Sequence, residues 1–334
     1  MRHRTTALVI GVTLTLFGLA LAVPAAPAAG SSGSRGAIPR NAERFAGGWA
    51  VPISTKGPSW FDAAYFHRVM RAGTRGARLP RGAAMPKAAG LAYPGIRPGL
   101  WLVTVIANSK EIGFVWCTAN FVFQKNGVYG LGTAGHCAAK DALGAFPDVT
   151  AYVVPPPTSG QLPGFYHIGK FVLSHNNGIG DDFAMIQIYP QYSSWVNPTM
   201  EVWGGPVGTY TATLPTVVKW FGHGVVVGTG GTARAGFAPI WTARKGTAFA
   251  WYGPSTEGDS GSGVEAIGTA GPDLAAGDLT HLVIFDGRVG CNKKGCTVSA
   301  GEILPGMMAG TRITKILSIA SGWSLVNGSL APVP

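Results

Sequence analysis

A serine flanked by glycines is the first feature of the sequence that could perform chemistry. Ser260 lies in the run GDSGSG, residues 258–263. A serine hydroxyl is a weak nucleophile at neutral pH and needs a base beside it. Flanking glycines permit a tight turn that points backbone N–H groups toward a developing oxyanion. Taken alone, such a run is equally compatible with a simple glycine-rich loop.

Two further motifs contain a histidine and a carboxylate that could assist this serine. His136 lies in the run TAGHC, residues 133–137, at the end of an expected strand. Asp182 follows Asp181 and directly precedes the apolar run FAMI. A carboxylate in that position can hold an imidazole in one tautomer and stabilise its protonated form. Each motif alone is more typical of a structural histidine or a turn, but the order histidine, aspartate, serine indicates acyl-transfer chemistry.

The three motifs in this order resemble the chymotrypsin-like (trypsin-fold) serine proteases of bacterial type. The matched runs are TAGHC, DFA and GDSG, and the run GTRITKIL at residues 310–317 resembles the family's closing strand and helix. The resemblance covers about residues 99–322. It implies an all-β fold of two six-stranded antiparallel β-barrels with a short C-terminal helix and the active site between the barrels.

The resemblance also implies a role for each matched residue. Ser260 would be the nucleophile, His136 the general base and then the general acid, and Asp182 the group that orients His136. The backbone N–H groups of Gly258 and Ser260 would form the oxyanion hole. We prefer Asp182 to Asp181 because the family's aspartate directly precedes its apolar strand.

Several positions depart from the family pattern. Gly135 replaces an alanine, and no activation site of the animal type precedes the domain, so we expect Asp259 to have a partner other than a free N-terminus. Pro254 stands six residues before the nucleophile, at the base of the family's primary pocket, and does not support a preference for Lys or Arg. His281 is either a pocket residue or a core or surface histidine.

The local pattern from residue 99 onward independently predicts strands. Short apolar runs, such as residues 100–106 and 115–123, alternate with turn residues, and the chain contains 50 Gly and 24 Pro. The run Lys125–Gly127 predicts a hairpin turn. Only residues 311–318 have helical spacing, and this distribution is typical of an antiparallel sandwich or a pair of barrels.

The N-terminal third divides into two segments. Residues 1–28 have a charged start, an apolar run and a small-residue cleavage site, which predicts a signal peptide; the alternative is an uncleaved membrane anchor. Residues 29–98 are basic and predict a pro-segment or a linker, with a basic arm for anionic polymers as a third alternative. Within them, Ser59 could cap a short helix. Residues 99–334 form the expected protease domain.

The net charge of +11 is confined to the N-terminal third. Residues 99–334 contain 13 basic and 13 acidic side chains, so this part has no basic field that could hold a phosphate backbone. We therefore expect no nucleic-acid partner. No second apolar span is present, and we expect no membrane association once the signal peptide is removed.

Export implies an oxidising compartment in which cysteines form pairs. The four cysteines allow three connectivities, and short separation favours Cys117 with Cys137 and Cys291 with Cys296. A zinc site is the alternative, but the spacings lack the paired ligand pattern. We expect neither a metal nor another cofactor.

The sequence therefore predicts a secreted, monomeric serine endopeptidase, made as a zymogen, that cleaves polypeptides through an acyl-enzyme on Ser260. One alternative is an inert binding protein on a protease fold. Another is an esterase or other acyl hydrolase that uses the same three residues.

Overall fold

The structure is a computed structural model, and it divides the chain into two units, Met1–Arg35 and Gly36–Pro334. All the residues that it describes belong to the second unit: 41–71, 94–107, 112–141, 143–212, 215–224, 231–243, 246–267, 273–284, 291–292, 295–296 and 305–329. The expected signal peptide at residues 1–28 lies outside the described residues.

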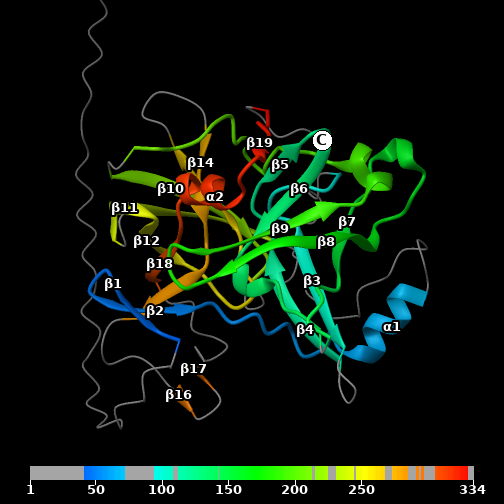
Figure 1. Cartoon of the computed structure of the whole chain (residues 1–334), viewed down its shortest axis with the longest axis horizontal. Coiled ribbons are helices and arrows are strands. Elements are labelled where there is room, and N and C mark those ends of the chain that lie inside the picture. The colour runs from blue at the N-terminus through cyan, green and yellow to red at the C-terminus, as the bar shows by residue number, and fades with distance from the viewer. Residues whose placement is uncertain are drawn as a thin grey trace, which may run out of the picture. The chain divides into compact units, whose positions relative to one another are not determined.

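One antiparallel sheet has eight strands and contains the histidine and aspartate motifs (Figure 1). Its strand order is β19-β5-β6-β9-β8-β7-β3-β4. The turn between β5 and β6 is formed by Asn126 and Gly127, both with positive φ, as the hairpin signal predicted. The strands are β3 (Trp101–Ala107), β4 (Ile112–Thr118), β5 (Val122–Lys125), β6 (Val128–Thr133), β7 (Asp148–Val153), β8 (Gly164–Asn176), β9 (Asp182–Ile188) and β19 (Ser324–Leu325).

The other large sheet has nine strands in the order β1-β2-β15-β18-β12-β11-β10-β13-β14, and Ser260 lies between two of them. They are β1 (Glu43–Phe45), β2 (Gly48–Pro52), β10 (Thr216–Gly222), β11 (Thr232–Ala243), β12 (Ala248–Pro254), β13 (Gly263–Ile267), β14 (Asp273–Asp278), β15 (His281–Ile284) and β18 (Pro305–Thr311). A separate short pair consists of β16 (Cys291–Asn292) and β17 (Gly295–Cys296).

These two sheets confirm the all-β, two-barrel architecture of the chymotrypsin-like type with a C-terminal helix. Each sheet contains more strands than the expected six. Among the described residues, neither sheet closes through a hydrogen-bonded pair between its end strands. Part of the excess comes from outside the expected domain, because β1 and β2 belong to the basic N-terminal segment and extend the sheet beyond β15.

The helices are short and peripheral. They are α1 (Ala63–Arg71) and α2 (Ile313–Ile319), with 3-10 turns η2 (Gly135–Cys137), η3 (Pro157–Ser159) and η4 (Pro190–Trp195). Helix α1 begins later than predicted: Asp62, not Ser59, caps it, because the Tyr65 N–H donates to Asp62 Oδ1 at 2.7 Å. No helix in the described part of the chain is long and apolar enough to cross a membrane.

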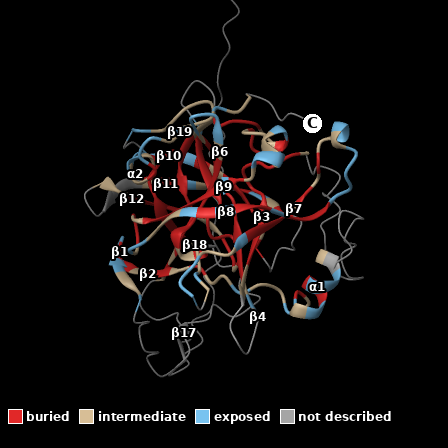
Figure 2. Ribbon diagram, turned by 45° about the vertical axis from the view of Figure 1, so that its right-hand side comes forward, coloured by how far each residue is buried: buried red, intermediate tan, exposed pale blue. Residues whose placement is uncertain are grey.

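Buried residues occur throughout the strands of both sheets (Figure 2), and each sheet contains a cluster of buried side chains of its own. One core includes Leu131, Ala184 and Ile186 of the eight-stranded sheet. Another includes Trp220 and Trp251 of the nine-stranded sheet. Apolar residues of the strands fill these clusters, and the polar residues of the three motifs lie at or beyond the strand ends.

Candidate active site

The structure brings His136, Asp182 and Ser260 together from three separate segments. His136 Nδ1 is 2.7 Å from Asp182 Oδ2, and His136 Nε2 is 2.7 Å from Ser260 Oγ. The backbone N–H of His136 also donates to Asp182 Oδ1 at 2.9 Å. The two bonds from Asp182 fix both the ring and the main chain of His136. Together with the contact between His136 and Ser260, they form a continuous hydrogen-bonded line of three side chains.

His136 is held in place by the turn on which it lies. The turn η2 follows β6, and Cys137 is disulfide-bonded to Cys117 of β4, as the sequence predicted. Gly135 lies so close to the His175 carbonyl oxygen that an added Cβ would be 1.7 Å from it. A side chain at position 135 would therefore collide with β8, which runs directly past this turn.

The Ser260 loop rests against the other sheet. The Thr118 N–H donates to the Ser260 carbonyl at 2.8 Å, and the Thr118 hydroxyl donates to the Gly258 carbonyl at 2.9 Å. Gly261 has a φ of 90°, and an added Cβ there would be 2.1 Å from Thr133 Oγ1. A residue with a side chain would thus be strained and obstructed at Gly261, which explains the second glycine of the motif.

Asp259 is buried and paired with a cation. Its Oδ2 is 2.7 Å from Arg234 Nη1, and the side chain of each residue is almost fully buried. The N–H groups of Gly224 and Thr256 and the Ser255 hydroxyl also donate to this carboxylate. The sequence predicted that Asp259 has a partner other than a free N-terminus. That partner is Arg234 of β11.

The carboxyl group of Asp182 is fully buried and still favours its charged form. Burial acts to raise its pKa, but the charge and hydrogen bonds of His136, together with the charge of His281, hold the pKa below its usual value. An ionised Asp182 can stabilise positive charge on His136, which is what a histidine needs when it accepts a proton.

Asp278 lies near this carboxylate and behaves in the opposite way. Burial raises its pKa well above the usual value, and the negative charge of Asp182 raises it further. Its Oδ1 accepts the Thr311 N–H at 3.0 Å. Asp278 therefore holds its proton to higher pH than an ordinary carboxyl group does, whereas Asp182 favours its charged form. The sequence analysis did not single out this residue.

His281 is also buried next to the candidate site. Its Nδ1 is 2.7 Å from Thr280 Oγ1 and 3.8 Å from Asp182 Oδ2, and its ring meets the His136 ring edge-on at 6.4 Å between centroids. The sequence left open whether this histidine belonged to the pocket, the core or the surface. It lies in the core, against the carboxylate that holds His136.

Asp181 is not part of the hydrogen-bonded line. It is partly exposed, and its Oδ1 lies 3.3 Å from both His175 Nδ1 and Lys315 Nζ. Of the second expected disulfide, Cys291 and Cys296, the structure describes only the backbone, in which the two residues pair across β16 and β17. Their side chains lie outside the described part of the structure.

A segment that the sequence did not associate with the site passes over Ser260. The hydroxyl oxygen of Ser260 is 3.2 Å from the carbonyl oxygen of Ile53 in this segment. The Gly258 N–H donates to the carbonyl oxygen of the next residue, Ser54, at 3.1 Å. One of the two expected oxyanion-hole donors therefore has a partner within the chain itself. No signal in the residue types of this segment pointed to chemistry, since it carries only small, apolar and hydroxyl side chains near Ser260.

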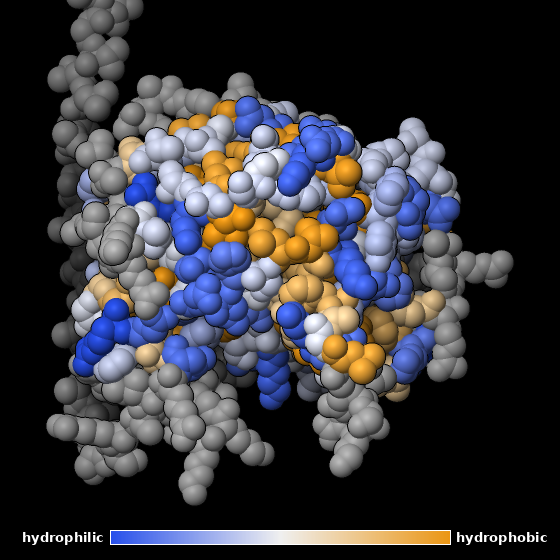
Figure 3. Space-filling view, in the orientation of Figure 1, coloured by the Kyte–Doolittle hydropathy of each residue, from blue (hydrophilic) through white to orange (hydrophobic). Residues whose placement is uncertain are grey.

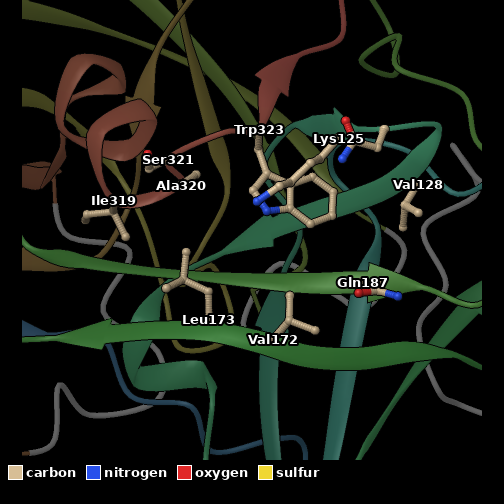
Figure 4. A pocket seen from close by; sticks show the side chains of 10 residues that line it. Lys125, Val128, Val172, Leu173, Gln187, Ile319, Ala320, Ser321 and Trp323 are labelled. Atoms are coloured by element: carbon tan, nitrogen blue, oxygen red, sulfur yellow. The ribbon is translucent and has the colours of Figure 1, made fainter.

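The surface also contains a pocket of about 420 Å³ away from these groups (Figure 4). Val172 and Leu173 of β8, Ile319 of α2 and Trp323 are among its lining residues, and none of the three candidate catalytic residues lines it. Apolar side chains gather near the middle of the face seen in Figure 3. The pocket is open and contains no charged pair, and we assign it no chemistry.

Comparison with known proteins gives structural neighbours only. No protein-family model and no curated protein matches the chain. Among solved structures, Thermobifida fusca Protease A is 18% identical, with a TM-score of 0.41, covering 70% of this chain and 99% of that one. A glutamic acid specific serine protease described as using a novel histidine triad in substrate binding is 16% identical, with a TM-score of 0.41, covering 69% and 100%.

A third neighbour is a thermostable serine protease from an extremophilic microorganism. It is 14% identical, with a TM-score of 0.42, and the match covers 66% of this chain and 94% of that one. Identities and TM-scores this low say nothing about the reaction that this chain performs.

Proposed function

We propose that the protein is a secreted serine endopeptidase. The observation that carries the proposal is the line from Asp182 through His136 to Ser260, with 2.7 Å at both side-chain contacts. A hydroxyl at this distance from an imidazole nitrogen can pass its proton to it during attack on a carbonyl carbon. We interpret residues 1–28 as the export signal and residues 99–334 as the catalytic domain.

In the proposed reaction, Ser260 Oγ attacks the carbonyl carbon of a peptide bond, and its proton moves to His136 Nε2. Asp182 stabilises the positive charge that then develops on His136. Gly258 and Ser260 donate their N–H groups to the oxyanion, and His136 returns the proton to the leaving amine. Water hydrolyses the resulting acyl ester by the same route in reverse order.

The test is covalent labelling with a fluorophosphonate probe, followed by peptide and ester substrate panels. We expect the wild type to be labelled and Ser260→Ala to lose labelling by about a thousandfold or more. Ser194→Ala, a substitution at an exposed serine of η4, is the matched control and should label like the wild type. Because residues 53 and 54 cover Ser260, the same measurement is made on Ile53→Glu, which destabilises that cover.

Absence of labelling in both the wild type and Ile53→Glu contradicts the proposal and favours an inert binding protein on this fold. Labelling with turnover of esters but of no peptide favours an acyl hydrolase instead.

A further inference from the structure

The stretch from Gly48 to Thr55, which we call the strap, crosses the candidate active site as an extended chain. The N-terminal part of the strap, up to the point where it reaches Ser260, is strand β2. This strand pairs antiparallel with β15, with Val51 opposite Leu282. The bonding continues beyond β2, because the Ile53 N–H donates to the Thr280 carbonyl at 3.0 Å. Figure 1 shows the chain continuing from β2 to α1.

On the C-terminal side of Ile53 the strap is held by the Ser260 loop and by the eight-stranded sheet. The Gly258 N–H of that loop donates to the Ser54 carbonyl at 3.1 Å, and the Trp116 N–H of β4 donates to the Thr55 carbonyl at 2.8 Å. Main-chain hydrogen bonds on both sides are how a groove holds an extended peptide, whatever its sequence. The strap is thus bound in the manner of a peptide ligand.

The peptide bond between these two sets of hydrogen bonds is Ile53–Ser54. The Ile53 carbonyl oxygen lies 3.2 Å from Ser260 Oγ. The Ser260 Oγ in turn lies 2.7 Å from His136 Nε2. No other carbonyl of the strap has a described contact with the Ser260 hydroxyl. The chain therefore presents one particular bond of its own to the candidate nucleophile.

The side chain before this bond is buried in an apolar environment. Ile53 is 2% exposed and belongs to the core cluster that includes Val218, Trp220 and Trp251. Pro52 precedes it and has no N–H that would require a partner. Because this side chain is fixed in the cluster, the position of the carbonyl group that follows it is restricted as well.

We propose that Ile53–Ser54 is the bond that this site cleaves in its own chain, and that the uncut strap keeps other peptides out of the site. This inference rests on the proposed function, and it adds a substrate preference: an aliphatic residue on the acyl side of the cleaved bond. It also assigns a function to the N-terminal basic segment, which the sequence left as either a pro-segment or a linker.

The cleavage needs one rearrangement. In the structure Gly258 donates to Ser54 and not to Ile53, and the Ser260 hydroxyl faces the Ile53 oxygen rather than its carbon. The Ile53 carbonyl must turn so that its oxygen accepts the Gly258 and Ser260 N–H groups. Since a folded contact has to be broken first, we expect self-cleavage to be slow compared with turnover of a free peptide.

Once the carbonyl has turned, a bond forms between Ser260 Oγ and the Ile53 carbonyl carbon, and the hydroxyl proton moves to His136 Nε2. The bond from this carbon to the Ser54 nitrogen then breaks, and His136 gives its proton to that nitrogen. A water molecule attacks the Ile53 ester, and its proton returns through His136 to Ser260. The products are a carboxylate on Ile53 and an amine on Ser54, with no oxidant or reductant required.

Both products remain attached to the protein after the cut. Upstream, β2 keeps its pairing with β15, β1 keeps its pairing with β2, and Glu43 Oε1 accepts the Ile179 N–H at 3.1 Å. Downstream, Phe61 and Tyr65 of the α1 region pack with Trp101 and Trp116 in one aromatic cluster. Cleavage alone does not clear the site, so activity toward other peptides appears when the upstream product leaves.

The experiment follows purified full-length chain over time by intact mass and N-terminal sequencing. We expect the wild type to yield a new N-terminus at Ser54 at a rate independent of protein concentration, as for an intramolecular step. Ser260→Ala should stay intact, and Ser194→Ala should be cut like the wild type. Circular dichroism checks that every variant is folded.

Substitutions at Ile53 test the acyl-side preference. Ile53→Val removes one methylene and should slow the cut by about tenfold or less. Ile53→Glu places a charge in the apolar cluster and should slow the cut by more than about a hundredfold, while fluorophosphonate labelling of Ser260 becomes faster. Ile53→Ala serves as a second loosened variant if the charged one fails to fold.

The outcomes separate this inference from the proposed function. An uncut wild type together with a labelled Ile53→Glu chain overturns self-cleavage and leaves the peptidase in place. A cut at another bond, or an equal cut in Ser260→Ala, also overturns it. If no variant is labelled by the probe, the peptidase itself is refuted.

Discussion

His281 and His136 approach the same oxygen atom of Asp182. The His136 Nδ1 is 2.7 Å from Asp182 Oδ2, and the His281 Nδ1 is 3.8 Å from it. Burial acts to raise the pKa of Asp182, but the charge and side-chain hydrogen bond of His136 lower it, and the charge of His281 lowers it further. We therefore infer that His281 is a positioning residue that acts through Asp182.

We predict that His281→Phe, which replaces the imidazole with an aromatic ring that has no nitrogens, slows labelling of Ser260 by about ten- to a hundredfold, as for a slight misplacement of reacting groups. The acidic limb of the pH profile should also move to higher pH. The reason is that Asp182 loses a neighbour that lowers its pKa, so its carboxylate is protonated earlier as the pH falls.

The matched control is His175→Phe, since His175 contacts Asp181 and not Asp182. Its rate and pH profile should remain those of the wild type. A His281→Phe chain that is slower but has an unshifted acidic limb would show that His281 acts only through packing.

The two adjacent aspartates provide a direct test of the proposed catalytic line. Asp182→Asn should lower kcat by about ten-thousandfold, because an amide leaves His136 in the wrong tautomer. Asp181→Asn loses only partly exposed contacts with His175 and Lys315, each worth about 0–1 kcal/mol. Peptide hydrolysis and labelling rates of both variants measure the difference, and equal losses would refute the assignment of Asp182.

The sequence predicted most of the fold and the three central residues because the information for both is local. Each of His136, Asp182 and Ser260 lies in a short run whose neighbours set its backbone: a strand end, a strand start and a glycine turn. Alternating apolar runs likewise predicted the strands without knowledge of their partners. The distances between the three residues then follow from how the two sheets pack.

The strap and the role of His281 could not be predicted from sequence for the opposite reason. Ile53 reaches Ser260 from 207 positions away in the chain, and nothing in the types of residues 48–55 indicates a ligand. His281 is one histidine on a strand, and its contact with Asp182 depends on how β15 packs against the other sheet. Such contacts between distant segments leave no pattern of spacing.

The buried pair of Arg234 and Asp259 should be essential for both stability and activity. Arg234→Met leaves the Asp259 carboxylate buried without its cation, which costs about 3–5 kcal/mol in the free energy of unfolding. Labelling of Ser260 should fall as well, because Asp259 anchors the turn that carries it. Denaturant unfolding and probe labelling measure the two effects.

Lys219→Met is the control for that substitution, because Lys219 and Asp273 form a 2.7 Å pair that is more exposed. Its loss of stability should be clearly smaller. If Arg234→Met is as stable as the wild type, the hydrogen bonds from Gly224, Ser255 and Thr256 are sufficient to stabilise the buried Asp259 carboxylate without the arginine.

Glu265 should make the protein less stable as the pH rises. Its carboxyl group is fully buried, its Oε2 accepts the Trp203 Nε1–H at 2.8 Å, and burial raises its pKa from 4.5 to about 8. Between these two values the unfolded chain releases a proton that the folded chain keeps. The free energy of unfolding therefore falls as the pH increases through this range.

Glu265→Gln keeps an oxygen for Trp203 and cannot ionise, so we predict that it removes this decline. The melting temperature of the variant should exceed that of the wild type by a margin that grows from about pH 4.5 to about pH 8. Glu257→Gln makes the same change at a partly exposed position and should retain the wild-type dependence. A constant difference between Glu265→Gln and the wild type across this range would mean that Glu265 is ionised in the folded protein.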